Sequence, residues 1–169
     1  MSITGMKTWI YFLTWFVRYY AVYFIVHIIV SAIIAATFKQ IPYYIPLVVF
    51  LLFDILLVVQ SFFVQIFFTR AKTGIIFSLL FFILQYVIYY AVASNDDPSI
   101  SANRAISIIP HVAFILAFKE MLYVESIKGV LTFTSVFSSY TIATAIVSFI
   151  LNILFYGALT WYLDQVFPN

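Results

Sequence analysis

The stretch PLVVFLLFDILLVVQSFFVQIFF, residues 46–68, decides the fold class of this chain. It holds 23 residues and a single formal charge, that of Asp54. At a rise of about 1.5 Å per residue, a helix of this length reaches roughly 34 Å, which is enough to cross a hydrocarbon core of about 30 Å. A short basic turn with Arg70 and Lys72 follows, and a second apolar run begins at once. This pattern predicts a helical hairpin in a membrane.

The composition extends this prediction to the whole chain. Of its 169 residues, 66% are hydrophobic and only 8% are charged, and the mean hydropathy is +1.14. Soluble domains carry about 25% charged residues, so this chain has too little polar surface for a water-soluble globule. It has no cysteine, which excludes disulfides and thiolate metal sites. The net charge of +2 gives no indication of a nucleic-acid partner.

The lengths of the apolar runs predict four transmembrane helices in an all-α integral membrane protein with a single transmembrane domain. The first run is longer than a bilayer requires, so we expect residues 8–16 to lie at the interface and Arg18 to reach the near surface. The predicted spans are residues 19–38, 45–68, 74–93 and 134–162. Four spans place both chain ends on the same face. The positive charges are nearly balanced between the two faces and do not decide which face that is.

Residues 106–123 form a shorter segment between the third and fourth spans. Their uninterrupted apolar run covers only residues 112–118; Pro110 lies before it and Lys119 and Glu120 end it. This run is too short to cross a bilayer. We interpret the segment as a re-entrant or interface-lying helix, whose free backbone groups need protein or water around them. Pro110, Glu120 and the nearby Glu125 are its candidate functional residues.

Each predicted span carries a line of polar residues at helical spacing. Polar side chains that face lipid are costly, so these lines should face other helices or a cavity. Ordinary interhelical hydrogen bonds explain most of the Ser, Thr and Gln positions, and a polar translocation surface is the alternative. The candidates from these lines are His27, Asp54, Gln65, Gln85, Ser148 and Asn152.

Asp54 and His27 are the two ionisable members of these lines. An unpaired carboxylate near mid-span costs on the order of 3 kcal/mol, so Asp54 is either paired or solvated at an interface, or buried for a functional reason. His27 is more often an interhelical hydrogen-bonding residue than a metal ligand, because no second ligand follows it at i+3 or i+4. The chain contains no phosphate-binding loop, nucleophile elbow or zinc-protease motif.

Five short motifs occur in a fixed order along nearly the whole chain. They are residues 3–6 (ITGM) with 13–16 (LTWF), residues 67–71 (FFTRA), residues 108–114 (IIPHVAF), Glu125 with Gly129, and residues 160–168 (TWYLDQVFP). Together they resemble motifs in the later part of one transmembrane domain of the A subfamily of ATP-binding cassette (ABC) transporters. Two departures are that Pro110 stands one position early and that Asn169 replaces a glycine.

The resemblance implies a membrane-spanning part of a lipid exporter, with cytosolic termini and a re-entrant segment on the outer or lumenal side. It also implies three partners: membrane lipids, a second transmembrane half, and a nucleotide-binding domain that would hold ATP and Mg²⁺. This chain has no Walker motif, so we expect it to hold no cofactor and to be no ATPase by itself, and to be a fragment of a larger transporter. The alternative is a self-contained four-span protein acting as an interaction or assembly subunit; a fainter one is an ion-conducting pore using Asp54 and His27.

Overall fold

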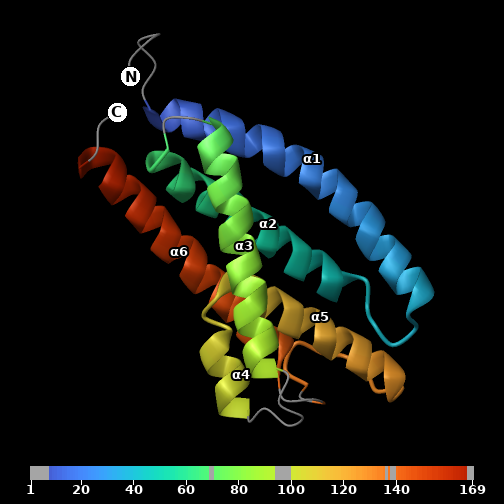
Figure 1. Cartoon of the computed structure of the whole chain (residues 1–169). Coiled ribbons are helices and arrows are strands. Elements are labelled where there is room, and N and C mark those ends of the chain that lie inside the picture. The colour runs from blue at the N-terminus through green and yellow to red at the C-terminus, as the bar shows by residue number, and fades with distance from the viewer. Residues whose placement is uncertain (1–7, 69–70, 94–99, 136, 138–139, 167–169) are drawn as a thin grey trace.

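The computed structural model describes residues 8–68, 71–93, 100–135, 137 and 140–166, and their regular structure is helical. Four of the described helices are long and apolar enough to cross a membrane, which confirms the predicted count of spans. They are α1, α2, α3 and α6, and two further helices, α4 and α5, lie between α3 and α6 (Figure 1). The bounds are α1 Thr8–Thr37, α2 Tyr44–Ile66, α3 Ala71–Ala93, α4 Ile100–Ile106, α5 Pro110–Ser126 and α6 Ile142–Val166.

Two boundaries differ from the sequence-based expectation. Helix α1 is continuous from Thr8, because no glycine or proline interrupts residues 8–37. Helix α6 begins at Ile142 rather than at residue 134. The intervening residues are rich in Ser and Thr, whose hydroxyls compete for backbone hydrogen bonds and disfavour helix. Each difference moves a helix end, and the order of the spans is unchanged.

The short segment expected at residues 106–123 corresponds mostly to α5, and a second helix, α4, which the sequence did not predict, precedes it. Helix α4 ends at Ile106 and α5 begins at Pro110. Ile109 is extended, with φ −85° and ψ 122°, because the proline ring disfavours helical backbone in the residue before it. Proline itself suits the first position of a helix, where its missing N–H has no intrahelical role. The two helices therefore form a hairpin whose tip is residues 107–109.

Helix α2 is the centre of the bundle. It packs against α6 and α1 most extensively, and also against α5 and α3. In its most apolar window 39% of the residues are buried, against 6% in the corresponding windows of α1 and α3. Figure 1 shows the start of α1 and the end of α6 at one end of the bundle, and the α1–α2 connection at the other. Helices α1 and α3 are therefore peripheral and leave most of their surface for lipid or protein.

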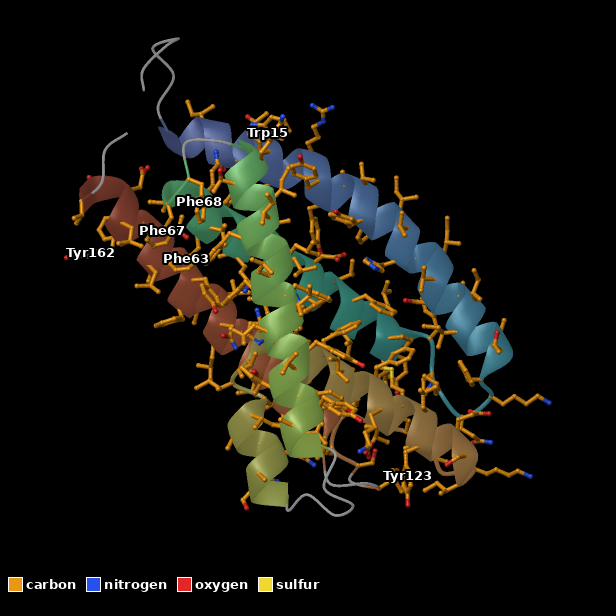
Figure 2. All side chains as sticks on the ribbon, viewed as in Figure 1. Trp15, Phe63, Phe67, Phe68, Tyr123 and Tyr162 are labelled. Atoms are coloured by element: carbon orange, nitrogen blue, oxygen red, sulfur yellow. The ribbon has the colours of Figure 1, made fainter. Side chains whose placement is uncertain are left out.

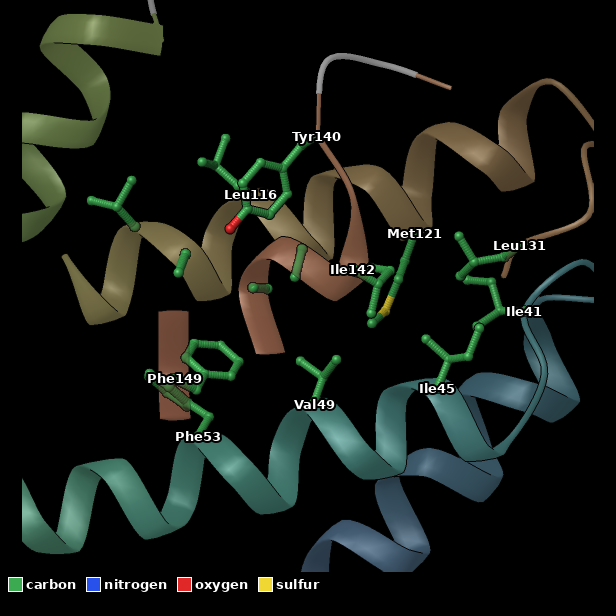
Figure 3. Packing of buried hydrophobic residues seen from close by; sticks show 14 of the residues in the cluster. Ile41, Ile45, Val49, Phe53, Leu116, Met121, Leu131, Tyr140, Ile142 and Phe149 are labelled. Atoms are coloured by element: carbon green, nitrogen blue, oxygen red, sulfur yellow. The ribbon is translucent and has the colours of Figure 1, made fainter. Parts of the chain in front are cut away.

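The core lies between α2, α5 and α6. Phe53 of α2 and Phe149 of α6 meet with ring centroids 5.7 Å apart (Figure 3). Phe53 also stacks on Phe114 of α5 at 4.2 Å. Met121 and Ile142 are fully buried in the same cluster. Lipid tails are as apolar as these side chains, so close packing and dispersion stabilise this core rather than exclusion of water.

Several aromatic side chains lie near the two ends of the bundle. Figure 2 shows Trp15, Phe67, Phe68 and Tyr162 toward the end that holds the start of α1, and Tyr123 toward the opposite end. Trp15 also carries the guanidinium of Arg18 over its ring, 5.5 Å from the centroid. Aromatic rings with a polar edge favour the headgroup level of a bilayer. The distribution agrees with a bundle that crosses a membrane along the length of its four long helices.

Candidate functional site

The tip of the α4–α5 hairpin is held by the polar line of α6. Ser148 donates its hydroxyl hydrogen bond to the carbonyl of Ser107. The amide of Asn152 donates to the carbonyl of Ile108 at 3.0 Å and to the carbonyl of Ser148 at 2.8 Å. The carbonyls at the end of a helix have no intrahelical partner, and in a membrane they need one from the protein. Ser148 and Asn152 supply these partners.

Helix α3 provides a hydrogen-bond acceptor for the other side of the same hairpin tip. Oε1 of Gln85 accepts from Nδ1 of His111 at 2.7 Å and from the backbone N–H of His111 at 3.4 Å. Gln85 thus caps the first turn of α5 from a neighbouring helix, where α5 has no capping side chain of its own. Gln85 Oε1 can only accept, so Nδ1 of His111 carries the hydrogen of this bond, and burial favours the neutral form of the ring. With Nδ1 donating, its Nε2 is a hydrogen-bond acceptor.

Two glutamates hold the far half of α5 to the connections between spans. Glu120 is fully buried, and its Oε1 accepts from the backbone N–H of Phe137 at 2.8 Å. Glu125 accepts through Oε2 from the backbone N–H of Gln40, which lies between α1 and α2, at 2.9 Å. Hydrogen bonds to a charged acceptor are about twice as strong as neutral ones. The two carboxylates therefore fix connecting segments that would otherwise carry free backbone donors.

His27 and Asp54 form a separate polar contact between α1 and α2. His27 Nδ1 and Asp54 Oδ2 lie 2.5 Å apart, and the Asp54 side chain is only 4% exposed. The imidazole also stacks on Phe50, with ring centroids 4.8 Å apart. Asp54 is therefore paired and buried rather than solvated at an interface. Within the described residues no group of three His, Cys, Asp or Glu side chains is placed to bind a metal ion.

A groove runs between α2 and α3 and ends at His111. It consists of two hollows, of about 160 Å³ and 300 Å³, that share Ser61, Val64 and Ser78. The smaller hollow is completed by Gln60 and His111, among others. The larger one continues past Gln65 to Phe68 and Gly74 at the α2–α3 connection. No Asp, Glu, Lys or Arg is among the described residues that line either hollow.

The structure places the sequence-predicted candidates in four regions. Gln85, Pro110, Ser148 and Asn152 meet at the hairpin tip, and Glu120 and Glu125 lie along the rest of α5. His27 and Asp54 pair with each other, and Gln65 lines the groove.

The sequence did not predict His111 and Gln60 as site residues. His111 was visible only as part of a motif. Gln60 lies off the polar line of its helix, because six residues turn it by about 240° from Asp54. Its side chain is 5% exposed, and its amide nitrogen has no hydrogen-bond partner within the described residues.

These features define a multi-pass integral membrane protein with a helical hairpin packed among its spans. The family model for "ABC-2 family transporter protein" matches residues 1–162, so the chain belongs to that family and is a membrane component of an ABC transporter. Membership implies an ABC nucleotide-binding partner. None of the curated proteins compared with this sequence matches it.

Proposed function

We propose that this chain forms part of the membrane path of an ABC-type lipid exporter. The observation that carries the proposal is the groove between α2 and α3, which combines apolar walls with Gln60, Ser61 and Ser78 and holds no formal charge among its described residues. An ion would need carboxylates or a ring of carbonyls to replace its hydration shell. An amphipathic lipid needs apolar walls and a few uncharged hydrogen-bonding groups, which is the composition found.

ATP hydrolysis and the binding of Mg²⁺ are assigned to the nucleotide-binding partner, because these 169 residues contain no Walker sequence. The role of this chain is then to provide helices that change their packing when the partner closes. Helices α2 and α3 suit such a change, since α2 packs far less extensively against α3 than against α6. A second transmembrane half would complete the path on the open faces of α1 and α3.

Replacing Ser78 by tryptophan is expected to block lipid transport. Ser78 lines both hollows of the groove, so an indole at this position fills the space where they join. With the nucleotide-binding partner present in sealed vesicles, ATP-dependent transfer of a fluorescent phospholipid between leaflets should fall by at least about tenfold, a loss of roughly 1.4 kcal/mol in transition-state stabilisation.

The matched control for this experiment is Ile76→Trp on the same helix. Ile76 is exposed and does not line the groove, so transport should stay near the wild-type rate. Equal transport by both variants would contradict the proposed path. Failure of the chain to co-purify with any nucleotide-binding subunit would contradict the assignment to a lipid exporter and support an independent assembly role.

We also propose that the α4–α5 hairpin is re-entrant and that its open end faces the outer or lumenal side. The support is the hydrogen bonding of its tip. Ser148, Asn152 and Gln85 bond the backbone groups of the tip, which lipid could not satisfy. The two helices have 7 and 17 residues, and only the tip reaches the middle of α6.

Glycosylation mapping tests this topology. In microsomal membranes, acceptor sites introduced at residue 99 and at residue 126 should both be modified. Modification of one site alone would show that the segment crosses the membrane, and modification of neither would place both ends in the cytosol. An acceptor in the α2–α3 connection is the control and should remain unmodified.

A further inference from the structure

A second groove lies on the other side of the hairpin, between α4 and α6. It has a volume of about 310 Å³ and is lined by Arg104 and Ile108 from the hairpin side and by Thr144, Val147 and Leu151 from α6. It shares no lining residue with the α2–α3 groove. Two of its polar lining residues, Ser148 and Asn152, already form hydrogen bonds to the hairpin tip.

Arg104 gives this groove a positive rim. It is in the last turn of α4, three residues before Ser107, and its side chain is exposed. No ion pair of Arg104 occurs within the described part of the chain, and no acidic residue is among those lining the groove. Ser107 is bonded to Ser148, so Arg104 lies level with the turn of α6 near Thr144, close to where α6 begins. A guanidinium at the edge of a hydrocarbon layer favours the phosphate level of the bilayer.

Below this rim, α6 presents a continuous apolar face. Val147, Leu151 and Leu154 are spaced by four and three residues and are 55%, 61% and 64% exposed, and Phe155, four residues after Leu151, is 58% exposed. From Thr144 to Phe155 the helix rises about 16 Å, which matches the roughly 15 Å depth of one leaflet. An acyl chain that begins at the rim would thus have apolar contact along its length.

We infer that the α4–α6 groove binds a resident phospholipid, whose phosphate pairs with Arg104 and whose acyl chain lies along α6. The occupant is identified by charge complementarity at the rim together with an apolar strip of leaflet length. Such a lipid would cover the side of the hairpin that no other described helix covers. The inference is independent of what the transporter moves, since it concerns a different groove.

Native mass spectrometry of the purified full chain tests this site by lipid titration. Phosphatidylglycerol should be retained, whereas a diacylglycerol with the same acyl chains, which lacks the phosphate, should bind at least about tenfold more weakly. Arg104→Gln should lower phosphatidylglycerol affinity by a similar factor, and Arg104→Lys should restore most of it. The control Arg18→Gln removes an exposed guanidinium from α1 and should leave binding unchanged.

A second variant leaves Arg104 unchanged and fills the apolar part of the α4–α6 groove. Leu151→Trp should expel the lipid while Arg104 is intact, and a phospholipid with a photoreactive acyl chain should label residues 147–155 in the wild type only. Unchanged binding in both Arg104→Gln and Leu151→Trp would overturn the inference. So would cysteine cross-links from residue 151 to a second copy of the chain without lipid adducts, because that would place protein in the groove.

Discussion

Glu120→Ala is expected to lower the free energy of unfolding by about 3 kcal/mol. The substitution removes a fully buried acceptor, so the N–H of Phe137 loses its partner, and it leaves a space in the core beside α5. A buried unpaired donor costs about 1–3 kcal/mol, and the lost side-chain packing adds to this. The measurement is the denaturation midpoint in mixed detergent micelles, followed by circular dichroism.

Two neighbouring variants make this test specific. Glu120→Gln keeps an oxygen acceptor at the same position and should cost only about 1 kcal/mol. Lys119→Ala changes an exposed residue next in sequence and should leave the midpoint unchanged. If Glu120→Ala and Lys119→Ala gave the same midpoint, the carboxylate would not be the group that holds the segment before α6.

Asp54→Ala is expected to destabilise the packing of α1 on α2 by about 2 kcal/mol. Hydrogen bonds between transmembrane helices reach about 1.7 kcal/mol, and this variant also leaves the His27 imidazole without its partner. Helix α1 packs chiefly on α2, so few other contacts can compensate. Exposure of α1 can be followed by the rate at which a cysteine at residue 34, which packs against the core, reacts with a thiol reagent.

A double-mutant cycle isolates the pair in this experiment. His27→Leu combined with Asp54→Leu should be less destabilising than the sum of the two single changes. Each single change leaves one polar side chain without its partner, whereas the double change removes both polar side chains. Asp54→Asn can still bond the imidazole and should keep the fold intact. Additive effects in the cycle would show that the 2.5 Å contact contributes no coupling. Ser61→Ala is the neutral control, because the Ser61 hydroxyl donates to the carbonyl of Leu57 in the same helix.

Run length predicted the spans because the bilayer imposes one dimension on every crossing helix. A crossing helix needs about 20 apolar residues, and the 23-residue run at 46–68 and its neighbours reach that length, so their number and order followed from the sequence. The positions of the helix ends did not follow from the sequence, since they depend on local competition between helical and other backbone hydrogen bonds. Pro110 moves the start of α5 from the expected residue 106 to residue 110, and the Ser- and Thr-rich stretch before Ile142 delays α6.

The candidate site was only partly visible in the sequence, for a related reason. Helical spacing shows which residues share a face of one helix, so the line through Ser148 and Asn152 could be found. It does not show how two helices are rotated against each other. That Gln85 meets His111, or that Gln60 turns toward the α2–α3 groove, depends on packing between segments far apart in the chain.

The bonds of α5 have a mechanical consequence. One end of this helix is joined through the hairpin tip to α6 by Asn152, and the other end is joined by Glu125 to the bend that links α1 with α2. Helix α5 therefore connects two sides of the bundle through hydrogen bonds at both of its ends. A tilt of α6 that moves the hairpin tip must either carry the α1–α2 bend along with it or break the contact at Gln40, so the 17-residue α5 couples these two parts of the bundle in addition to the direct packing of α6 on α2.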